Sequence, residues 1–236
     1  EVTPLVDAHG AGRRRVSLHV REVDGAWSAG FMEQKSHDLI ALDYCPVLVP
    51  ALKQAAQLAA AFGPALGACD VAITAADNGL DVSIKAERQV VLRRLIAMNE
   101  IVSAFNILRL SVNGEVHTAR AAPAMSIGKA QVTLPTTSFL QATSAGEAAI
   151  AAVVLEAVKS AKHVADLFCG VGPFALRMAE KAKVYAADDD KPAIAAMQLA
   201  LRNTQGLKPV DAQSRDLFRE PLTPMELKPF DAVVLD

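Results

Sequence analysis

The segment Val164-Ala-Asp-Leu-Phe-Cys-Gly-Val-Gly-Pro-Phe-Ala-Leu176 decides the expected fold. Its first part, Val164 to Phe168, is a short apolar run of the kind found in buried parallel strands. From Ala175 to Ala182 the apolar residues return to helical spacing. Between these parts, Gly170 and Gly172 allow a sharp bend and a close approach of the backbone to a ligand. The segment therefore predicts a strand, a cofactor loop and a helix.

The order of residues in this loop excludes two phosphate-binding patterns. A phosphate cradle needs Lys-Ser/Thr after the glycines, and a dinucleotide site needs a third glycine, but residues 169–174 read Cys-Gly-Val-Gly-Pro-Phe. A second expected strand, Ala182 to Ala187, is followed by Asp188-Asp-Asp190. A carboxylate at that position accepts hydrogen bonds from ribose hydroxyls. Without a pyrophosphate clamp, S-adenosylmethionine fits best. Because such a loop also occurs in α/β domains generally, the flanking segments must support this interpretation.

Length and composition bound the class of protein. The 236 residues, 52% of them hydrophobic, are enough for one large domain or two small ones. No apolar run reaches the roughly 18 residues of a membrane helix, and the first residues do not resemble a signal peptide, so we expect a cytoplasmic protein with no membrane partner. Three scattered cysteines, Cys45, Cys69 and Cys169, argue against a disulfide scaffold. The net charge of −2 requires any nucleic-acid surface to be local.

The first half of the chain predicts an α+β unit. Alternating residues on both sides of Asp24-Gly25, Asp77-Asn-Gly79 and Asn113-Gly114 predict three hairpins. Apolar residues at helical spacing predict helices over 48–62 and 89–105. Basic residues accompany the first hairpin: Arg13, Arg14, Arg15, Arg21, Lys35 and His37. We interpret them as a solvated outward face, with a phosphate-contacting strip as the alternative.

The second half predicts a parallel sheet. A strand over 130–134 and an extended connection over 135–141 lead to a helix that Ser144 and Glu147 would start as a capping box. From residue 164, strands alternate with helices as far as Phe230-Asp-Ala-Val-Val-Leu-Asp236, which is typical of a doubly wound α/β sheet with ligands at the carboxyl ends of its strands. Four acids fall near such ends: Asp166, Asp188, Asp216 and Asp236.

Taken together, these segments resemble the S-adenosylmethionine-dependent RNA uracil-C5 methyltransferases, which act on ribosomal or transfer RNA. The residues that carry the resemblance are Gly30-Phe31, Ser36-His37, Asp43-Tyr-Cys45-Pro, Phe139-Leu-Gln141, Asp166 to Phe174, Asp188, Asp216 and Phe230 to Asp236. They span nearly the whole chain. The cofactor loop is shared with many methyltransferases, whereas its combination with Phe-Leu-Gln and Asp-Tyr-Cys-Pro is more specific.

The resemblance implies a Rossmann-like class I methyltransferase domain with an incomplete parallel sheet, preceded by an α+β central domain. The central domain would cover residues 1–129, and the N-terminal half of the S-adenosylmethionine-binding domain would cover residues 130–236. The chain would therefore be a fragment of a family member that lacks both ends. Its partner would be RNA, ribosomal RNA being favoured over transfer RNA, and the protein would be a monomer.

The resemblance also assigns cofactor residues: Gln141, Asp166, Phe168, Gly170, Gly172, Asp188, Asp216 and Asp236. Gln141 and Phe168 would touch the cofactor, and the two glycines would shape the loop around its methionine part. Asp188, or Asp189 if the strand end shifts by one residue, would hold the ribose. Asp216 would face the adenine amino group, and Asp236 would lie where cofactor and target base meet. The family often has Asn at position 173, where this chain has Pro.

The reaction implied by the resemblance needs a cysteine that adds to C6 of uracil and a base that removes the C5 proton. Both are expected after Asp236, so no catalytic residue is assigned within the chain and the fragment is expected to be inactive. Cys169 and Cys69 are interpreted as packing residues. Cys45 matches the last ligand of a 4Fe-4S cluster in the family, but no three cysteines precede it, so a cluster is expected only in an intact parent.

Two other functions stay open on the sequence. One is a class I methyltransferase with a different substrate, such as a protein or a small molecule. The other is a noncatalytic RNA-binding module that retains the fold.

Overall fold

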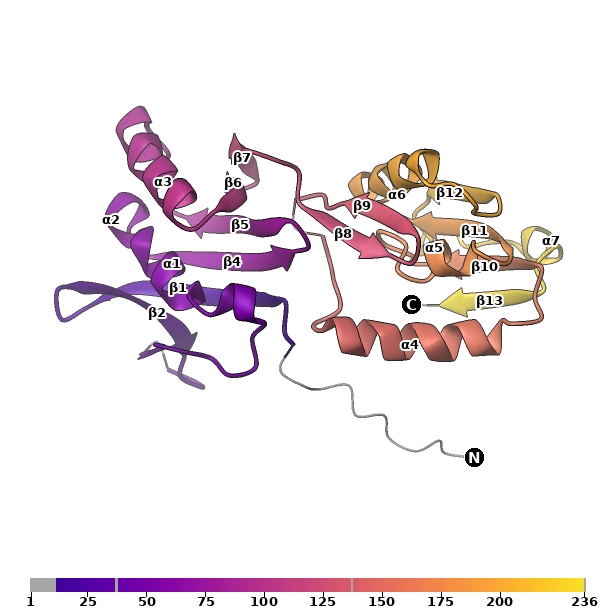
Figure 1. Ribbon diagram of the computed structural model, residues 1–236, viewed down its shortest axis with the longest axis horizontal. Coiled ribbons are helices and arrows are strands. Elements are labelled where there is room, and N and C mark those ends of the chain that lie inside the picture. Colours follow the sequence, from indigo (N-terminus) through magenta and orange to yellow (C-terminus); the bar gives the residue numbers. More distant parts are fainter. Residues whose placement is uncertain (1–11, 37, 137, 236) are drawn as a thin grey trace. The chain divides into compact units, whose positions relative to one another are not determined.

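The computed structural model describes residues 12–36, 38–136 and 138–235, which fall into two compact units (Figure 1). The described part of the first unit is 12–36 and 38–123 with 142–144, and that of the second unit is the remainder from Ala124 onward. The boundary expected between residues 129 and 130 falls inside a hairpin of β8 (Ala124–Ile127) and β9 (Ala130–Thr133). Because these strands pair with each other, both belong to the second unit.

The described part of the first unit contains a seven-stranded sheet with the order β3-β2-β1-β4-β5-β6-β7. Its strands are β1 (Arg15–Val23), β2 (Ala26–Met32), β3 (Leu39–Ala41), β4 (Cys69–Ala76), β5 (Gly79–Ala86), β6 (Ile107–Val112) and β7 (Glu115–Ala119). Neighbouring strands are antiparallel except β5 and β6, which are parallel. The three expected hairpins, β1–β2, β4–β5 and β6–β7, are therefore confirmed.

Turn chemistry explains two of these hairpins. Asp24 and Gly25 have φ angles of 50° and 78°, and Asn113 and Gly114 have 51° and 85°. Two successive positive φ values match the right-handed twist of the flanking strands, and Asp-Gly and Asn-Gly adopt them at low cost. Residue burial then alternates along β4, which directs every second side chain into the core.

Short helices supply the other side of this core. They are η1 (Pro50–Leu52), α1 (Ala55–Ala61), α2 (Gly63–Leu66) and α3 (Leu92–Ala104). The single helix expected over 48–62 is wrong: the chain forms η1 and α1 there and continues as α2. Pro64 does not stop the chain from being helical, because it sits in the first turn of α2, where a missing N–H is tolerated. Phe62 and Met98 are fully buried against the sheet.

The basic residues of the first hairpin do not form one outward face. Arg14 is 5% exposed, and its Nη1 lies 3.4 Å from Ser144 Oγ. Arg21 donates to the carbonyl oxygens of Val20 and Cys69. The expectation of a solvated strip is therefore wrong for Arg14, whose guanidinium is directed into the unit by a contact that is distant in sequence. His37 lies outside the described residues.

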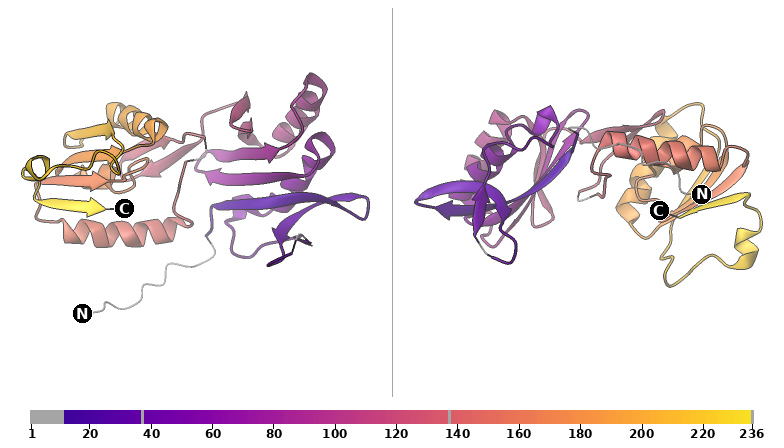
Figure 2. Two further views of the ribbon diagram at one scale, coloured as in Figure 1. Left: turned by 180° about the vertical axis from the view of Figure 1, so that it is seen from behind. Right: turned by 90° about the horizontal axis from the view of Figure 1, so that it is seen from below.

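The second unit contains, in its described part, a parallel four-stranded sheet with the order β12-β11-β10-β13. Its further elements are α4 (Ser144–Ala157), β10 (His163–Leu167), α5 (Ala175–Met178), β11 (Lys183–Asp188), α6 (Lys191–Asn203), β12 (Val210–Ser214), α7 (Pro224–Leu227) and β13 (Ala232–Leu235). β12 and β13 are the two edge strands of this sheet, and β13 lies beside β10 (Figures 1 and 2). Strands that alternate with helices in a parallel sheet confirm the expected α/β, Rossmann-like architecture.

Within the ranges that the structure describes, no helix is both long enough and apolar enough to cross a lipid bilayer.

Side-chain pairing fixes the connection between β12 and β13. Arg215 places Nη1 and Nη2 at 2.6 and 3.2 Å from the two carboxylate oxygens of Glu226. Glu226 also closes a capping box with Thr223 at the start of α7. The hydrogen bonds from Arg215, followed by those from Thr223, lower the pKa of Glu226 from its ordinary 4.5 to about 2. This carboxylate therefore stays ionised in the folded state well into the acid range.

We predict that Glu226→Gln flattens the acid dependence of stability. A carboxyl group whose folded pKa is depressed contributes stability above its unfolded pKa, and this contribution disappears as the pH falls from about 4.5 towards about 2. Thermal unfolding followed by circular dichroism at several pH values in this window would compare the variant with the wild type. Since the Glu226 carboxylate is solvent-exposed, the difference should shrink in high salt. Identical pH profiles would contradict the prediction.

Candidate cofactor site

The cofactor loop follows β10 directly and contains three residues in the left-handed region. Phe168, Gly170 and Gly172 have φ angles of 62°, 51° and 87°. Such a conformation costs a residue with a Cβ on the order of 1 kcal/mol, so two glycines relieve the loop of most of this cost. Phe168 is held there by packing, with its ring centroid 5.2 Å from that of Phe218. Strained positions of this kind persist where the surrounding structure holds them, often at binding sites.

Asp188 joins this loop to the next strand. It is the last residue of β11, which pairs in parallel with β10. Asp188 Oδ2 accepts a hydrogen bond from the Gly170 backbone N–H at 2.8 Å, and its Oδ1 accepts one from the Asp190 N–H at 2.9 Å. Asp190 in turn caps α6, because its Oδ1 accepts from the Ala193 N–H at 3.0 Å. These carboxylates fix the loop beside the start of α6.

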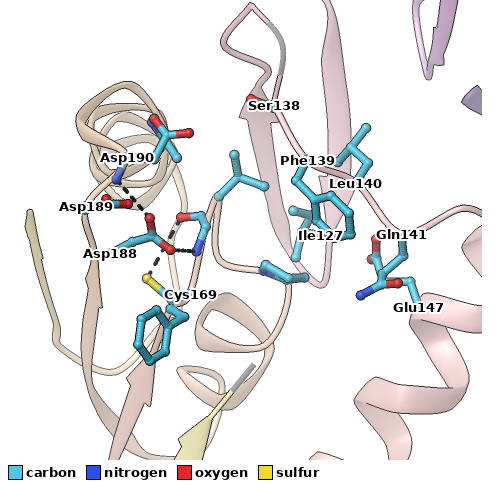
Figure 3. A pocket seen from close by; sticks show the side chains of 15 residues that line it. Ile127, Ser138, Phe139, Leu140, Gln141, Glu147, Cys169, Asp188, Asp189 and Asp190 are labelled. Atoms are coloured by element: carbon cyan, nitrogen blue, oxygen red, sulfur yellow. Dashed lines mark hydrogen bonds between the residues drawn. The ribbon is translucent and has the colours of Figure 1, made fainter. Parts of the chain in front are cut away.

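A cavity of about 300 Å³ opens at this edge of the sheet, within the size range of ligand pockets. The residues that line it are Ile127, Ser138, Phe139, Leu140, Gln141, Glu147, Phe168, Cys169, Gly170, Val171, Pro173, Asp188, Asp189, Asp190 and Ala193. Figure 3 shows the three consecutive aspartates at one end of the cavity and Gln141 with Glu147 at the other. The cavity is therefore polar at both ends and mostly apolar between them.

The structure brings some of the expected cofactor residues together at this cavity. Gln141, Phe168, Gly170 and Asp188 line it, and so does Asp189, the alternative ribose ligand. The others have different surroundings. Asp166 is fully buried within β10, Gly172 packs against the side chain of Met197, and Asp216 Oδ1 accepts hydrogen bonds from the N–H groups of Phe218 and Arg219. These three do not line the cavity, and Asp236 lies outside the described residues.

The lining residues that sequence reasoning missed include two, Ile127 and Glu147, from elements outside the cofactor loop and its flanking strands. Ile127 reaches the cavity from β8, a strand of four residues too short to be predicted from its alternation. Glu147, expected as a capping-box residue, lies in the first turn of α4, which begins at Ser144, and its carboxylate pairs with Arg177 at 2.7 Å. A charged residue within an Ala-rich helix was the available signal, because a carboxylate is rarely buried without a charged partner.

The donor and acceptor set suits a nucleoside with a cationic group. A Cβ added to Gly170 would meet nothing within 4 Å, so there is open space beside the loop backbone. The lining residues include four carboxylates, from Glu147 and the three aspartates, and among the described residues no Lys, Arg or His lines the cavity. Carboxylates accept from ribose hydroxyls and ammonium groups, whereas phosphates need cationic or N–H donors. S-adenosylmethionine therefore fits this cavity better than a nucleotide does.

The three thiols differ in their surroundings. Burial, with a smaller effect of Asp70, raises the pKa of the Cys69 thiol to about 11. Cys169 is 1% exposed within the cofactor loop, and Cys45 is half-buried. No group of three or more potential metal ligands is present in the described ranges of the chain. A cluster at Cys45 would thus need ligands in addition to those described.

Comparison with solved structures shows the fold. The chain superposes with a TM-score of 0.72 on the crystal structure of a tRNA (uracil-54, C5)-methyltransferase from Pyrococcus abyssi in complex with S-adenosyl-L-homocysteine. The match covers 95% of this chain and 58% of that one, at 16% sequence identity. This is a Rossmann-like methyltransferase fold.

Comparison of sequences finds relatives that are longer than this chain. Proteins named as uncharacterized RNA methyltransferases from Brucella suis and Rhizobium meliloti are 40% and 38% identical over 240 residues. Each match covers 100% of this chain and 58% of the relative, so the chain spans less than two thirds of their length. No family model matches the chain.

We predict that Gly172→Ala destabilises the second unit more than Gly206→Ala does. Both glycines have positive φ angles, 87° and 77°, so both variants carry a similar backbone strain of about 1 kcal/mol. At position 172 the new Cβ would also lie 3.1 Å from the Met197 side chain, whereas at 206 the nearest atom is 4.0 Å away. Urea unfolding measures both losses, and equal losses would contradict this account of the loop.

Proposed function

We propose that this chain is the central and cofactor-binding part of an S-adenosylmethionine-dependent RNA methyltransferase that modifies C5 of uridine. The observation that carries the proposal is the cavity at the ends of β10 and β11, which Asp188 and Gly170 line. Its ionisable lining residues are acidic, so it suits a ribose and an ammonium group better than a phosphate. The relatives from Brucella suis and Rhizobium meliloti are named as uncharacterized RNA methyltransferases, and these names support RNA as the substrate class.

Each expected residue keeps a defined role in this proposal. Asp188, assisted by Asp189, accepts hydrogen bonds from the ribose hydroxyls, and Gly170 lets the cofactor approach the backbone. Phe168 contacts the cofactor from the loop, and Gln141 contacts it from the opposite end of the cavity. Asp166 and Gly172 maintain the shape of the strand and loop. Asp216 contacts the adenine amino group, and Asp236 lies where the cofactor and the target base meet. When bound, S-adenosylmethionine supplies the methyl group.

The choice of uridine C5 follows from the family resemblance. The fold of this chain is similar to that of the superposed uracil methyltransferase, which is consistent with this choice. That chemistry needs a reactive thiolate, and a thiol with a pKa of about 11, such as Cys69, is a weak nucleophile at neutral pH. In line with the family resemblance, we propose that the nucleophile and the base are supplied by residues outside this chain. The proposal favours ribosomal RNA over transfer RNA as the substrate and a monomer as the oligomeric state. It also assigns Cys45 as a ligand of a 4Fe-4S cluster in an intact parent protein.

We predict that the chain binds S-adenosylhomocysteine and that Asp188→Asn and Asp189→Asn each weaken this binding by roughly tenfold to a hundredfold, because a hydrogen bond to a charged acceptor contributes about 1.5–3 kcal/mol. Isothermal titration calorimetry measures the affinities. Asp188 also bonds to the loop backbone, so the thermal midpoint of each variant is followed in parallel. Asp211→Asn, at an exposed position on β12, is the control. A folded wild-type chain that gives no binding heat would contradict the proposed site.

We predict that the chain by itself transfers no methyl group to RNA but supports transfer within a chimera. In the chimera, this chain replaces the matching part of the Brucella suis relative. Methyl-labelled cofactor, with ribosomal and transfer RNA tested separately, reports transfer, and nucleoside mass spectrometry should identify 5-methyluridine. A label on another base or on protein would overturn the uridine assignment, and transfer by the isolated chain would show that its own residues suffice.

A further inference from the structure

A partly buried ion pair links α4 to the cofactor loop. The Glu147 and Arg177 side chains are 6% and 18% exposed, and Glu147 Oε1 lies 2.7 Å from Arg177 Nη2. The other terminal nitrogen of Arg177, Nη1, donates to the carbonyl oxygen of Pro173 within the loop. One guanidinium thus holds both a carboxylate on α4 and the backbone of the loop.

Packing alone does not explain this pair. Removing two charges from water offsets most of their attraction, and apolar side chains of similar volume often stabilise a protein as well or better. All of α4 is described, and its buried residues are Glu147 and Ala151. The single charged residue that this Ala-rich helix buries is therefore the one that lines the cavity. A ligand with a complementary charge would account for its presence.

The position of Glu147 identifies the part of the ligand that it would meet. Glu147 and Gln141 lie at the end of the cavity opposite to the three aspartates (Figure 3). With the ribose at the Asp188 end, as in the proposed function, the amino-acid part of S-adenosylmethionine extends towards Glu147. That part carries an ammonium group, whose favoured acceptor is a carboxylate. Because a carboxylate accepts about four hydrogen bonds, it can hold Arg177 and an ammonium group together.

We propose that Glu147 binds the ammonium group of the cofactor's methionine part and that Arg177 is a positioning residue for it. This inference rests on the proposed function, since it requires the cofactor to occupy this cavity. Arg177 orients the Glu147 carboxylate, compensates its charge in the unliganded state, and fixes the Pro173 carbonyl. The fork of the guanidinium is needed because the two acceptors are contacted by different nitrogens.

The test compares two ligands that differ in the amino-acid part. S-adenosylhomocysteine carries it, and 5′-methylthioadenosine lacks it. We expect Glu147→Gln to weaken S-adenosylhomocysteine binding by roughly tenfold or more, as expected for one charge-assisted hydrogen bond, and to leave methylthioadenosine binding within about twofold. Arg177→Met should follow the same pattern, and Arg177→Lys should give an intermediate loss. Glu156→Gln, at an exposed position of α4, is the matched control and should change neither affinity.

Asp188→Asn separates the inference from the function on which it rests. This variant should weaken both ligands, because both contain the ribose. If Glu147→Gln weakens both ligands equally, or neither, while the wild type and Asp188→Asn behave as expected, Glu147 is a structural residue and the inference falls alone. If the folded wild-type chain binds neither ligand, the proposed function and the inference fall together.

Discussion

The double hydrogen bond of the Asp188 carboxylate is the interaction on which the cofactor site depends. Its two oxygens accept from the N–H groups of Gly170 and Asp190, one on the loop after β10 and one at the start of α6. Both donors belong to backbone that has no strand or helix partner at that point, so the carboxylate satisfies groups that would otherwise be costly. Its negative charge is also well placed beside the N-terminus of α6. The same group that shapes the loop therefore also lines the cavity.

Elements encoded by local chemistry could be predicted from the sequence. Asp24-Gly25 and Asn113-Gly114 adopt positive φ values that few other residue pairs reach, so the hairpins around them follow from a few residues. The loop at Gly170 was recognisable for the same reason, and the alternation of strands and helices after it determined the parallel sheet. In these cases the information lies in local residue chemistry and in the order of successive elements along the chain.

Features that depend on distant partners could not be predicted in this way. Glu147 is 30 positions from Arg177, so neither its ion pair nor its place in the cavity lining can be inferred from the local sequence. Arg14 was expected to face solvent, yet its backbone N–H donates to Ala142 and its guanidinium lies near Ser144. Asp216 lies after β12 as expected, but the turn that it stabilises through Phe218 and Arg219 sets its direction. At these positions the residue type indicates a charged group that needs a partner, and the tertiary contacts determine which partner it has.

The edge position of β13 affects how the parallel sheet opens locally. Within the described part of the chain, β13 is bonded to β10 along one side, whereas β10 and β11 have strands on both sides. Backbone amides of β13 that are directed away from β10 have no ladder acceptor there, and Leu235 is 70% exposed. Amide hydrogen exchange follows such local openings, so deuterium should enter the edge strands β12 and β13 before the two central strands. The cofactor loop, which follows β10, would then be anchored in the slowest-exchanging part of the sheet.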